Sequence, residues 1–143
     1  MRKPIIAGNW KMHKTVSEAI ELAEDIVMET NGTLNEVVVF PPFTALESVA
    51  DAIDGKHVGY GAQDLHWEDA GAYTGAVSGA MIADICAEYV LVGHSERRAL
   101  FGDNEAVVAK KMVAAYRNGL KPMLCVGENL EENLSDEYQE FVD

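Results

Sequence analysis

The chain has 143 residues, of which 48% are hydrophobic and 24% are charged, so its composition is that of an ordinary globular protein and its length fits a single domain, residues 1–143. Acidic residues outnumber basic ones by 24 to 11, and the formal net charge of −13 disfavours nucleic acid and anionic membrane surfaces as partners. No apolar run approaches the length that would span a bilayer.

Short β-branched runs alternate with segments of helical periodicity along the chain. The runs that predict strands are residues 5–8, 37–40, 58–62, 90–93 and 123–126. Such alternation is typical of right-handed βαβ units, which build parallel sheets. We therefore expect an α/β fold with five parallel strands and five helices.

Two of the predicted helices have clear starting signals. Thr15 with Glu18, and Thr44 with Glu47, have the spacing of capping boxes, in which each side chain satisfies a free backbone N–H of the first turn. We therefore expect helices to begin beside Thr15 and Thr44.

Two later segments also have helical periodicity. After Asp103, an apolar stripe is expected to face the sheet, and it consists of Val107, Val108, Met112 and Tyr116. Residues 128–143 are strongly acidic but keep apolar residues at helical spacing. They predict an acid-faced fifth helix.

Polar residues follow two of the predicted strands directly. The first strand ends in Gly-Asn-Trp-Lys-Met at residues 8–12, and the fourth ends in Gly-His-Ser-Glu-Arg-Arg at residues 93–98. Parallel strands gather their carboxyl ends on one face, where α/β proteins place their chemistry. Gln63 follows the third strand and is predicted either to steady Asn9 or to cap the chain locally.

These two strings resemble the signature stretches of the triosephosphate isomerase family. The resemblance covers residues 4 to about 130, which would be the first five of eight strand-helix units, so the expected fold is a truncated TIM barrel that is open rather than closed. By this resemblance, the catalytic positions are His94, Lys11 and Glu96, and the substrate-binding positions are Asn9 and Lys11.

The resemblance implies a glycolytic isomerase that interconverts dihydroxyacetone phosphate and glyceraldehyde 3-phosphate through an enediolate. This reaction needs a base, an electrophile and groups that bind the phosphate. A neutral His94 with Lys11 and Asn9 supplies the electrophile, as the family implies. The family's carboxylate base, lid and phosphate loops belong to later units, so the expected turnover is weak, with Glu128 or Glu96 as a substitute base.

Residues 65–78 form the longest irregular segment, and long loops are usually functional. This one carries Trp67 and Tyr73, which favours an interface. In the resembled family the loop inserts into a partner subunit, and the matching Thr74 would complete the neighbour's active site. Five parallel strands also leave exposed edges, so we expect a homodimer or a higher homo-oligomer.

The sequence has no metal-ligand spacing and no dinucleotide or P-loop pattern, so we expect neither a metal nor a cofactor. Cys86 and Cys125 lie in apolar runs, which predicts buried, reduced thiols in a cytoplasmic protein. Because the net charge repels anions, a phosphate would need local positive groups such as Lys11, Arg97 and Arg98.

Two other interpretations remain open at this point. The chain could be a non-catalytic binding or self-association module that retains half of an isomerase site. Alternatively, five βα units could form a flavodoxin-like, doubly wound sheet that binds a phosphorylated ligand at its switch point. Polar residues after four successive strands favour the rim of a barrel.

Overall fold

The structure is a computed structural model and describes residues 3–127. Its five strands are β1 (Ile5–Asn9), β2 (Glu36–Phe40), β3 (Val58–Ala62), β4 (Tyr89–Val92) and β5 (Lys121–Leu124). They form one parallel sheet in the order β1-β2-β3-β4-β5. In a doubly wound sheet the strand order reverses at a switch point, so the sequential order seen here excludes that alternative.

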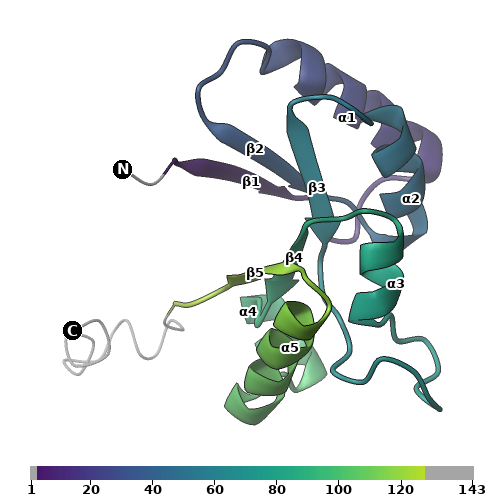
Figure 1. Ribbon diagram of the computed structural model, residues 1–143, viewed down its shortest axis with the longest axis vertical. Coiled ribbons are helices and arrows are strands. Elements are labelled where there is room, and N and C mark those ends of the chain that lie inside the picture. Colours follow the sequence, from purple (N-terminus) through teal and green to yellow (C-terminus); the bar gives the residue numbers. More distant parts are fainter. Residues whose placement is uncertain (1–2, 128–143) are drawn as a thin grey trace.

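Five helices lie on the convex side of the curved sheet (Figure 1). They are α1 (Val16–Glu29), α2 (Phe43–Ala52), α3 (Gly79–Asp84), α4 (Ser95–Phe101) and α5 (Glu105–Arg117). The expected fold, an open partial barrel with five parallel strands and five helices, is confirmed. The short α4 supplies one of the five helices, whereas the helix predicted within residues 128–143 lies outside the described residues.

The two predicted capping boxes had different outcomes. At α1, Oε2 of Glu18 accepts hydrogen bonds from the backbone N–H of Thr15 at 2.8 Å and from its hydroxyl at 2.9 Å, so this box is confirmed. The Thr44 box is wrong, because α2 begins at Phe43 and its N-cap is Pro42, two residues before Thr44. Pro42 has the extended backbone of an N-cap residue, with φ of −61° and ψ of 152°, so Thr44 lies inside the first turn and cannot cap it.

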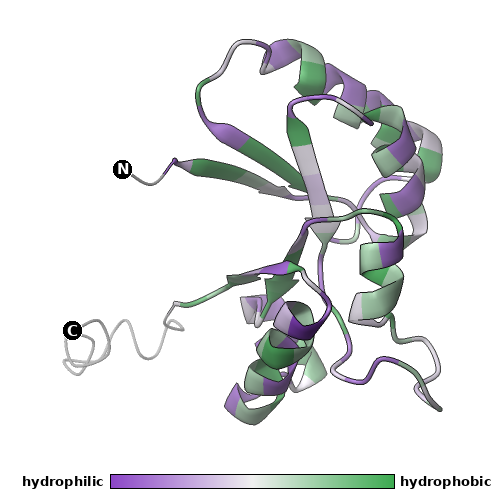
Figure 2. Ribbon diagram, in the orientation of Figure 1, coloured by the Kyte–Doolittle hydropathy of each residue, from purple (hydrophilic) through white to green (hydrophobic). Residues whose placement is uncertain are grey.

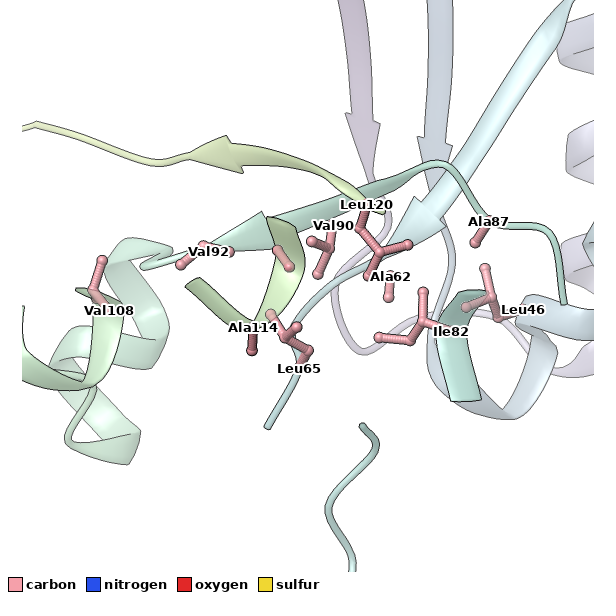
Figure 3. Packing of buried hydrophobic residues seen from close by; sticks show 11 residues of the cluster. Leu46, Ala62, Leu65, Ile82, Ala87, Val90, Val92, Val108, Ala114 and Leu120 are labelled. Carbon is pink, nitrogen blue, oxygen red and sulfur yellow. The ribbon is translucent and has the colours of Figure 1, made fainter. Parts of the chain in front are cut away.

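The larger core lies between the sheet and the helices on its convex side. Figure 3 shows side chains from β3 and β4 meeting those of α3 and α5. The fully buried cluster comprises Leu46, Ala62, Leu65, Ile82, Ala87, Val90, Val92, Val108, Ala114, Ala115 and Leu120. Burying this apolar surface fixes the strand ends relative to one another, and the strand ends carry the candidate site.

The inward face of α5 differs from the predicted stripe. Val108 is buried as expected, but Tyr116 is 66% exposed and Lys111 is only 3% exposed. Lys111 points toward the sheet because its ammonium group pairs there with the carboxylates of Asp64 and Asp103, as described below. The prediction for Tyr116 is therefore wrong.

The concave face of the sheet holds a second, smaller core. Its buried members are Val38, Phe40, Tyr89 and Leu91. Gly61 of β3 faces the same side, and a Cβ atom added there would lie 2.4 Å from the Tyr89 carbonyl oxygen and 2.7 Å from Cε1 of Phe40. Only glycine fits this close approach of β3 to β4.

The two outer strands carry hydrophobic residues (Figure 2), and some of these are well exposed. Ile6 on β1 is 56% exposed and Leu124 on β5 is 44% exposed. Within residues 3–127, β1 pairs only with β2 and β5 pairs only with β4, so each has one unpaired edge. None of the described helices is long and apolar enough to cross a membrane.

The cysteines only partly follow expectation. Cys125 is partly buried, and its burial raises the pKa of its thiol. Cys86 is exposed, so its predicted burial is wrong. It lies between α3 and β4 in the left-handed region, with φ of 57°.

Candidate active site

The candidate site is formed at the carboxyl ends of β1 and β4. Lys11 lies two residues beyond the end of β1, and His94 is the N-cap residue of α4. The Nζ of Lys11 is 2.7 Å from Oε1 of Glu96, and Oε2 of Glu96 is 3.6 Å from Nδ1 of His94. The structure therefore brings together the three residues that the sequence indicated as catalytic, while their roles stay predictions.

The imidazole of His94 is oriented by the backbone of α4. The N–H of Glu96 donates to Nδ1 of His94 at 3.2 Å. An accepting Nδ1 carries no proton, so this hydrogen bond selects the neutral ring with its proton on Nε2. His94 can thus present an N–H donor to a ligand without carrying a charge.

Lys11 and Glu96 form an accessible ion pair. The hydrogen bond from Lys11 lowers the pKa of the Glu96 carboxyl, so this group is ionised at neutral pH. The side chains of Lys11 and Glu96 are 50% and 44% exposed. Pairs this open to water add little stability, and an anionic ligand can compete for the ammonium group.

The backbone of Lys11 is held in an unusual conformation. Its φ of 53° lies in the left-handed region, which costs a non-glycine residue about 1–2 kcal/mol. The N–H of Lys11 donates to Oδ1 of Asn9 at 3.0 Å, and the carbonyl oxygen of Lys11 accepts a hydrogen bond from Nε2 of Gln63 at 2.9 Å. Asn9 therefore orients Lys11. Gln63 binds the backbone of Lys11, whereas the sequence had suggested that it either steadies Asn9 or caps the chain locally.

Arg97 and Arg98 were predicted to help hold a phosphate, but both are bound within the chain. The Nε of Arg97 lies 3.0 Å from Oδ2 of Asp64 and 2.9 Å from Oδ2 of Asp103. Arg98 donates to the carbonyl oxygen of Gly93 at 2.7 Å and pairs with Glu105. Of the three cations considered from sequence, Lys11 is the one directed to His94 and Glu96.

A buried charge network lies behind α4, and sequence reasoning missed it. The Nζ of Lys111 is 2.7 Å from both Oδ1 of Asp64 and Oδ2 of Asp103, and Arg97 contacts the same two carboxylates. Two cations thus balance two carboxylates, which joins the end of β3 to α4 and α5. The available signal was a lysine three residues after Val108, on the face of α5 that turns inward.

The pKa values of the two carboxyl groups in this network are shifted in opposite directions. Burial raises the pKa of Asp64 despite its contacts with Lys111 and Arg97. Burial also acts on Asp103, but the hydrogen bonds from Lys111 and Arg97 outweigh it and lower the pKa of that carboxyl. Among residues 3–127, no three side chains of the metal-ligating types gather to hold a metal ion.

The three residues predicted for an interface differ in exposure. Trp67 packs partly against the chain's own core, with Nζ of Lys110 lying 5.2 Å from its ring centre. Tyr73 is 44% exposed, its ring centre lies 4.2 Å from that of His66, and the next residue, Thr74, is exposed. Tyr73 and Thr74 are therefore accessible to a partner, whereas Trp67 packs mostly against residues of its own chain.

Comparison with known proteins gives one consistent family. The family model described as triosephosphate isomerase matches residues 4–143. A triosephosphate isomerase from Moorella thermoacetica is 54% identical over 132 residues, which cover 92% of this chain and 53% of that protein. One from Thermoanaerobacter pseudethanolicus is 49% identical over 132 residues, again with 92% and 53% covered.

A solved structure has the same arrangement. The crystal structure of triosephosphate isomerase from Bartonella henselae superposes with a TM-score of 0.85 at 38% identity, covering 92% of this chain and 55% of that one. The chain thus spans about half the length of the relatives it matches.

Proposed function

Because this chain belongs to the triosephosphate isomerase family, we propose that it binds a triose phosphate and interconverts dihydroxyacetone phosphate and glyceraldehyde 3-phosphate. The observation that carries the proposal is the convergence of Lys11, Glu96 and His94, with 2.7 Å between the first two and 3.6 Å between the last two. A cation and a neutral N–H donor side by side suit the developing negative charge of an enediolate.

In the proposed reaction, Lys11 and His94 act on the substrate oxygens. The ammonium group of Lys11 would attract the phosphate and the reacting carbonyl, and Nε2–H of His94 would donate to the enediolate oxygen. Asn9 supports this arrangement by fixing the N–H of Lys11. None of these groups has to change its charge for the oxygen to be stabilised.

The proposed base is Glu96, whose carboxylate contacts Lys11 and lies close to His94. A proton moves from one substrate carbon to the base and then to the neighbouring carbon, and the hydroxyl proton on the first carbon's oxygen moves to the oxygen of the second, so the reaction is balanced without a redox partner or a cofactor. Because Lys11 lowers the pKa of Glu96, this carboxylate is a weak base, and we expect slow turnover. Glu128 lies outside the described residues and stays an alternative base.

The test is isomerase activity in protein from a host that lacks its own triosephosphate isomerase. His94→Gln and Lys11→Met are expected to abolish the interconversion. Lys56→Met removes another exposed lysine, in the turn before β3, and should leave it unchanged. Equal rates in all three variants would show that the activity is a contaminant or uses another site.

A second candidate is a binding module without turnover. The exposure of Lys11 and Glu96 favours it, because a site open to water loses much of the electrostatic benefit on which catalysis depends. Calorimetry with dihydroxyacetone phosphate separates the candidates: binding that His94→Gln weakens, with no product formed, supports this second function.

We also propose that the chain forms a homodimer or a higher homo-oligomer through residues 65–78. The exposed Tyr73 and Thr74 support this, as do the poorly covered Ile6 and Leu124 on the outer strands. In such an assembly Thr74 would reach the Lys11 site of a second copy, as the family resemblance implies. The oligomer would thereby complete a site that one copy leaves open.

The proposed location is the cytoplasm. Both cysteines are free thiols, and Cys86 is exposed, which suits a reducing compartment. The net charge of −13 also supports a small-molecule partner rather than nucleic acid or an anionic membrane surface.

A further inference from the structure

We propose that Gln63 is a positioning residue, which fixes the backbone of Lys11 so that its ammonium group meets Glu96. The importance of this contact for catalysis rests on the proposed function, but the contact itself does not. Gln63 follows β3 directly and is partly buried. Its side chain reaches across the end of the sheet toward β1.

The side-chain amide of Gln63 joins three neighbouring strand ends. Its Nε2 donates to the carbonyl oxygen of Lys11 at 2.9 Å and to that of Phe40 at 2.8 Å. Lys11 follows β1, Phe40 ends β2, and Gln63 itself follows β3. Both protons of the amide are used, so a side chain that only accepts hydrogen bonds could not replace it.

The conformation of Lys11 makes this support necessary. With φ of 53°, Lys11 occupies a region that residues other than glycine rarely adopt without restraint. Oδ1 of Asn9 binds its N–H at 3.0 Å, and Nε2 of Gln63 binds its carbonyl oxygen. Both backbone polar groups of Lys11 are therefore held by side chains, and this fixes where its own side chain starts.

The residue next to Gln63 ties the same strand end to the opposite half of the site. Oδ2 of Asp64 lies 3.0 Å from Nε of Arg97, which is on α4 directly after Glu96. Oδ1 of Asp64 lies 2.7 Å from Nζ of the buried Lys111. Gln63 and Asp64 thus hold Lys11 on one side and α4 on the other, so the end of β3 sets the spacing between Lys11 and Glu96.

The test replaces Gln63 with methionine, which keeps the length of the side chain but has no N–H to donate. The readout is the titration of the Glu96 carboxyl, followed by carbon NMR. In the unmodified chain, the hydrogen bond from Lys11 holds the pKa of Glu96 below its ordinary value. Gln63→Met is expected to shift this titration upward. An unchanged titration in the folded variant overturns the proposal.

Asn118→Leu is the matched control. The Nδ2 of Asn118 also bridges two acceptors, Oδ1 of Asp69 and the carbonyl oxygen of Ala114, both at 2.9 Å. This bridge lies at the end of α5, away from Lys11. Its loss should lower the melting temperature without moving the Glu96 titration, and a shift as large as that in Gln63→Met would contradict a specific role for Gln63.

A second measurement needs no variant that might fail to fold. In the unmodified chain, the side-chain amide protons of Gln63 should exchange with water more slowly than those of free glutamine, and exchange at the free rate overturns the proposal. Neither readout depends on turnover. If isomerase activity is missing but the Glu96 titration shifts, the proposed function fails and the positioning role stands.

Discussion

The Nζ of Lys11 lies 2.7 Å from Oε1 of Glu96, and this one ion pair joins the loop after β1 to the start of α4. Each residue is directed by its own neighbours: Asn9 and Gln63 hold the backbone of Lys11, and Glu96 lies in the first turn of α4, which His94 caps. Since the pair is about half exposed, it contributes only slightly to the stability of the fold.

The first prediction concerns acid and Glu96. Lys11 lowers the pKa of Glu96 in the folded chain, so folding releases protons from this group, and its contribution to stability is present above the ordinary glutamate pKa. That contribution is lost as the pH falls through the lowered value. Denaturation curves should therefore show Glu96→Gln as slightly less stable than the unmodified chain at neutral pH, with the difference vanishing in acid. A difference that grows in acid would contradict the ion pair.

The second prediction concerns the buried network. Lys111→Met removes a cation that is 3% exposed and leaves Asp64 and Asp103 with Arg97 alone. Breaking a buried pair in this way costs about 3–5 kcal/mol, which urea denaturation would measure.

The neighbouring lysine is the control for that experiment. Lys110 is exposed and lies over the ring of Trp67 at 5.2 Å, so Lys110→Met should cost about 1 kcal/mol or less. Similar losses in Lys110→Met and Lys111→Met would show that the network contributes no more than a surface contact.

The third prediction concerns the approach of β3 to β4. In Gly61→Ala, the added methyl group would meet the backbone of Tyr89 at 2.4 Å, and a main-chain atom cannot move aside as a flexible side chain can. We expect a loss of about 3 kcal/mol, at the upper end of overpacking costs. Gly59→Ala, on the same strand, finds its nearest neighbour at 3.6 Å and should change stability by about 1 kcal/mol or less. Equal effects would contradict the close approach.

The parallel strands and the gathering of their ends could be predicted because both follow from periodicity, whereas the open barrel was implied by the resemblance to the triosephosphate isomerase family. Alternating strand and helix patterns imply parallel strands, and parallel strands gather their ends, which brought Lys11 and His94 to one face. The partners of Gln63 and Lys111 could not be predicted in this way. They depend on the left-handed turn at Lys11 and on which face of α5 turns inward, and tertiary contacts decide both.

The misplaced start of α2 has a similar cause. Thr44 and Glu47 have the right spacing for a capping box, but Pro42, two residues before Thr44, has the extended backbone of the N-cap residue. Two local signals competed, and their spacing alone could not show which would dominate. At α1, Thr15 and Glu18 had no such competitor, and the prediction was confirmed.

The last prediction concerns self-association through residues 65–78. Tyr73 is 44% exposed although its ring lies tilted against that of His66, so it offers a large, fairly rigid surface to a second copy. If the loop forms the interface, Tyr73→Ser should weaken self-association about tenfold or more, as loss of a central aromatic residue usually does. Met28→Ser alters a side chain that is 65% exposed on α1 and should leave association unchanged. Sedimentation over a range of concentrations would measure both. An unmodified chain that stays monomeric at micromolar concentration would contradict self-association altogether. Equal effects of the two substitutions would instead remove this loop as the interface and leave the exposed Ile6 and Leu124 as the surfaces to test next.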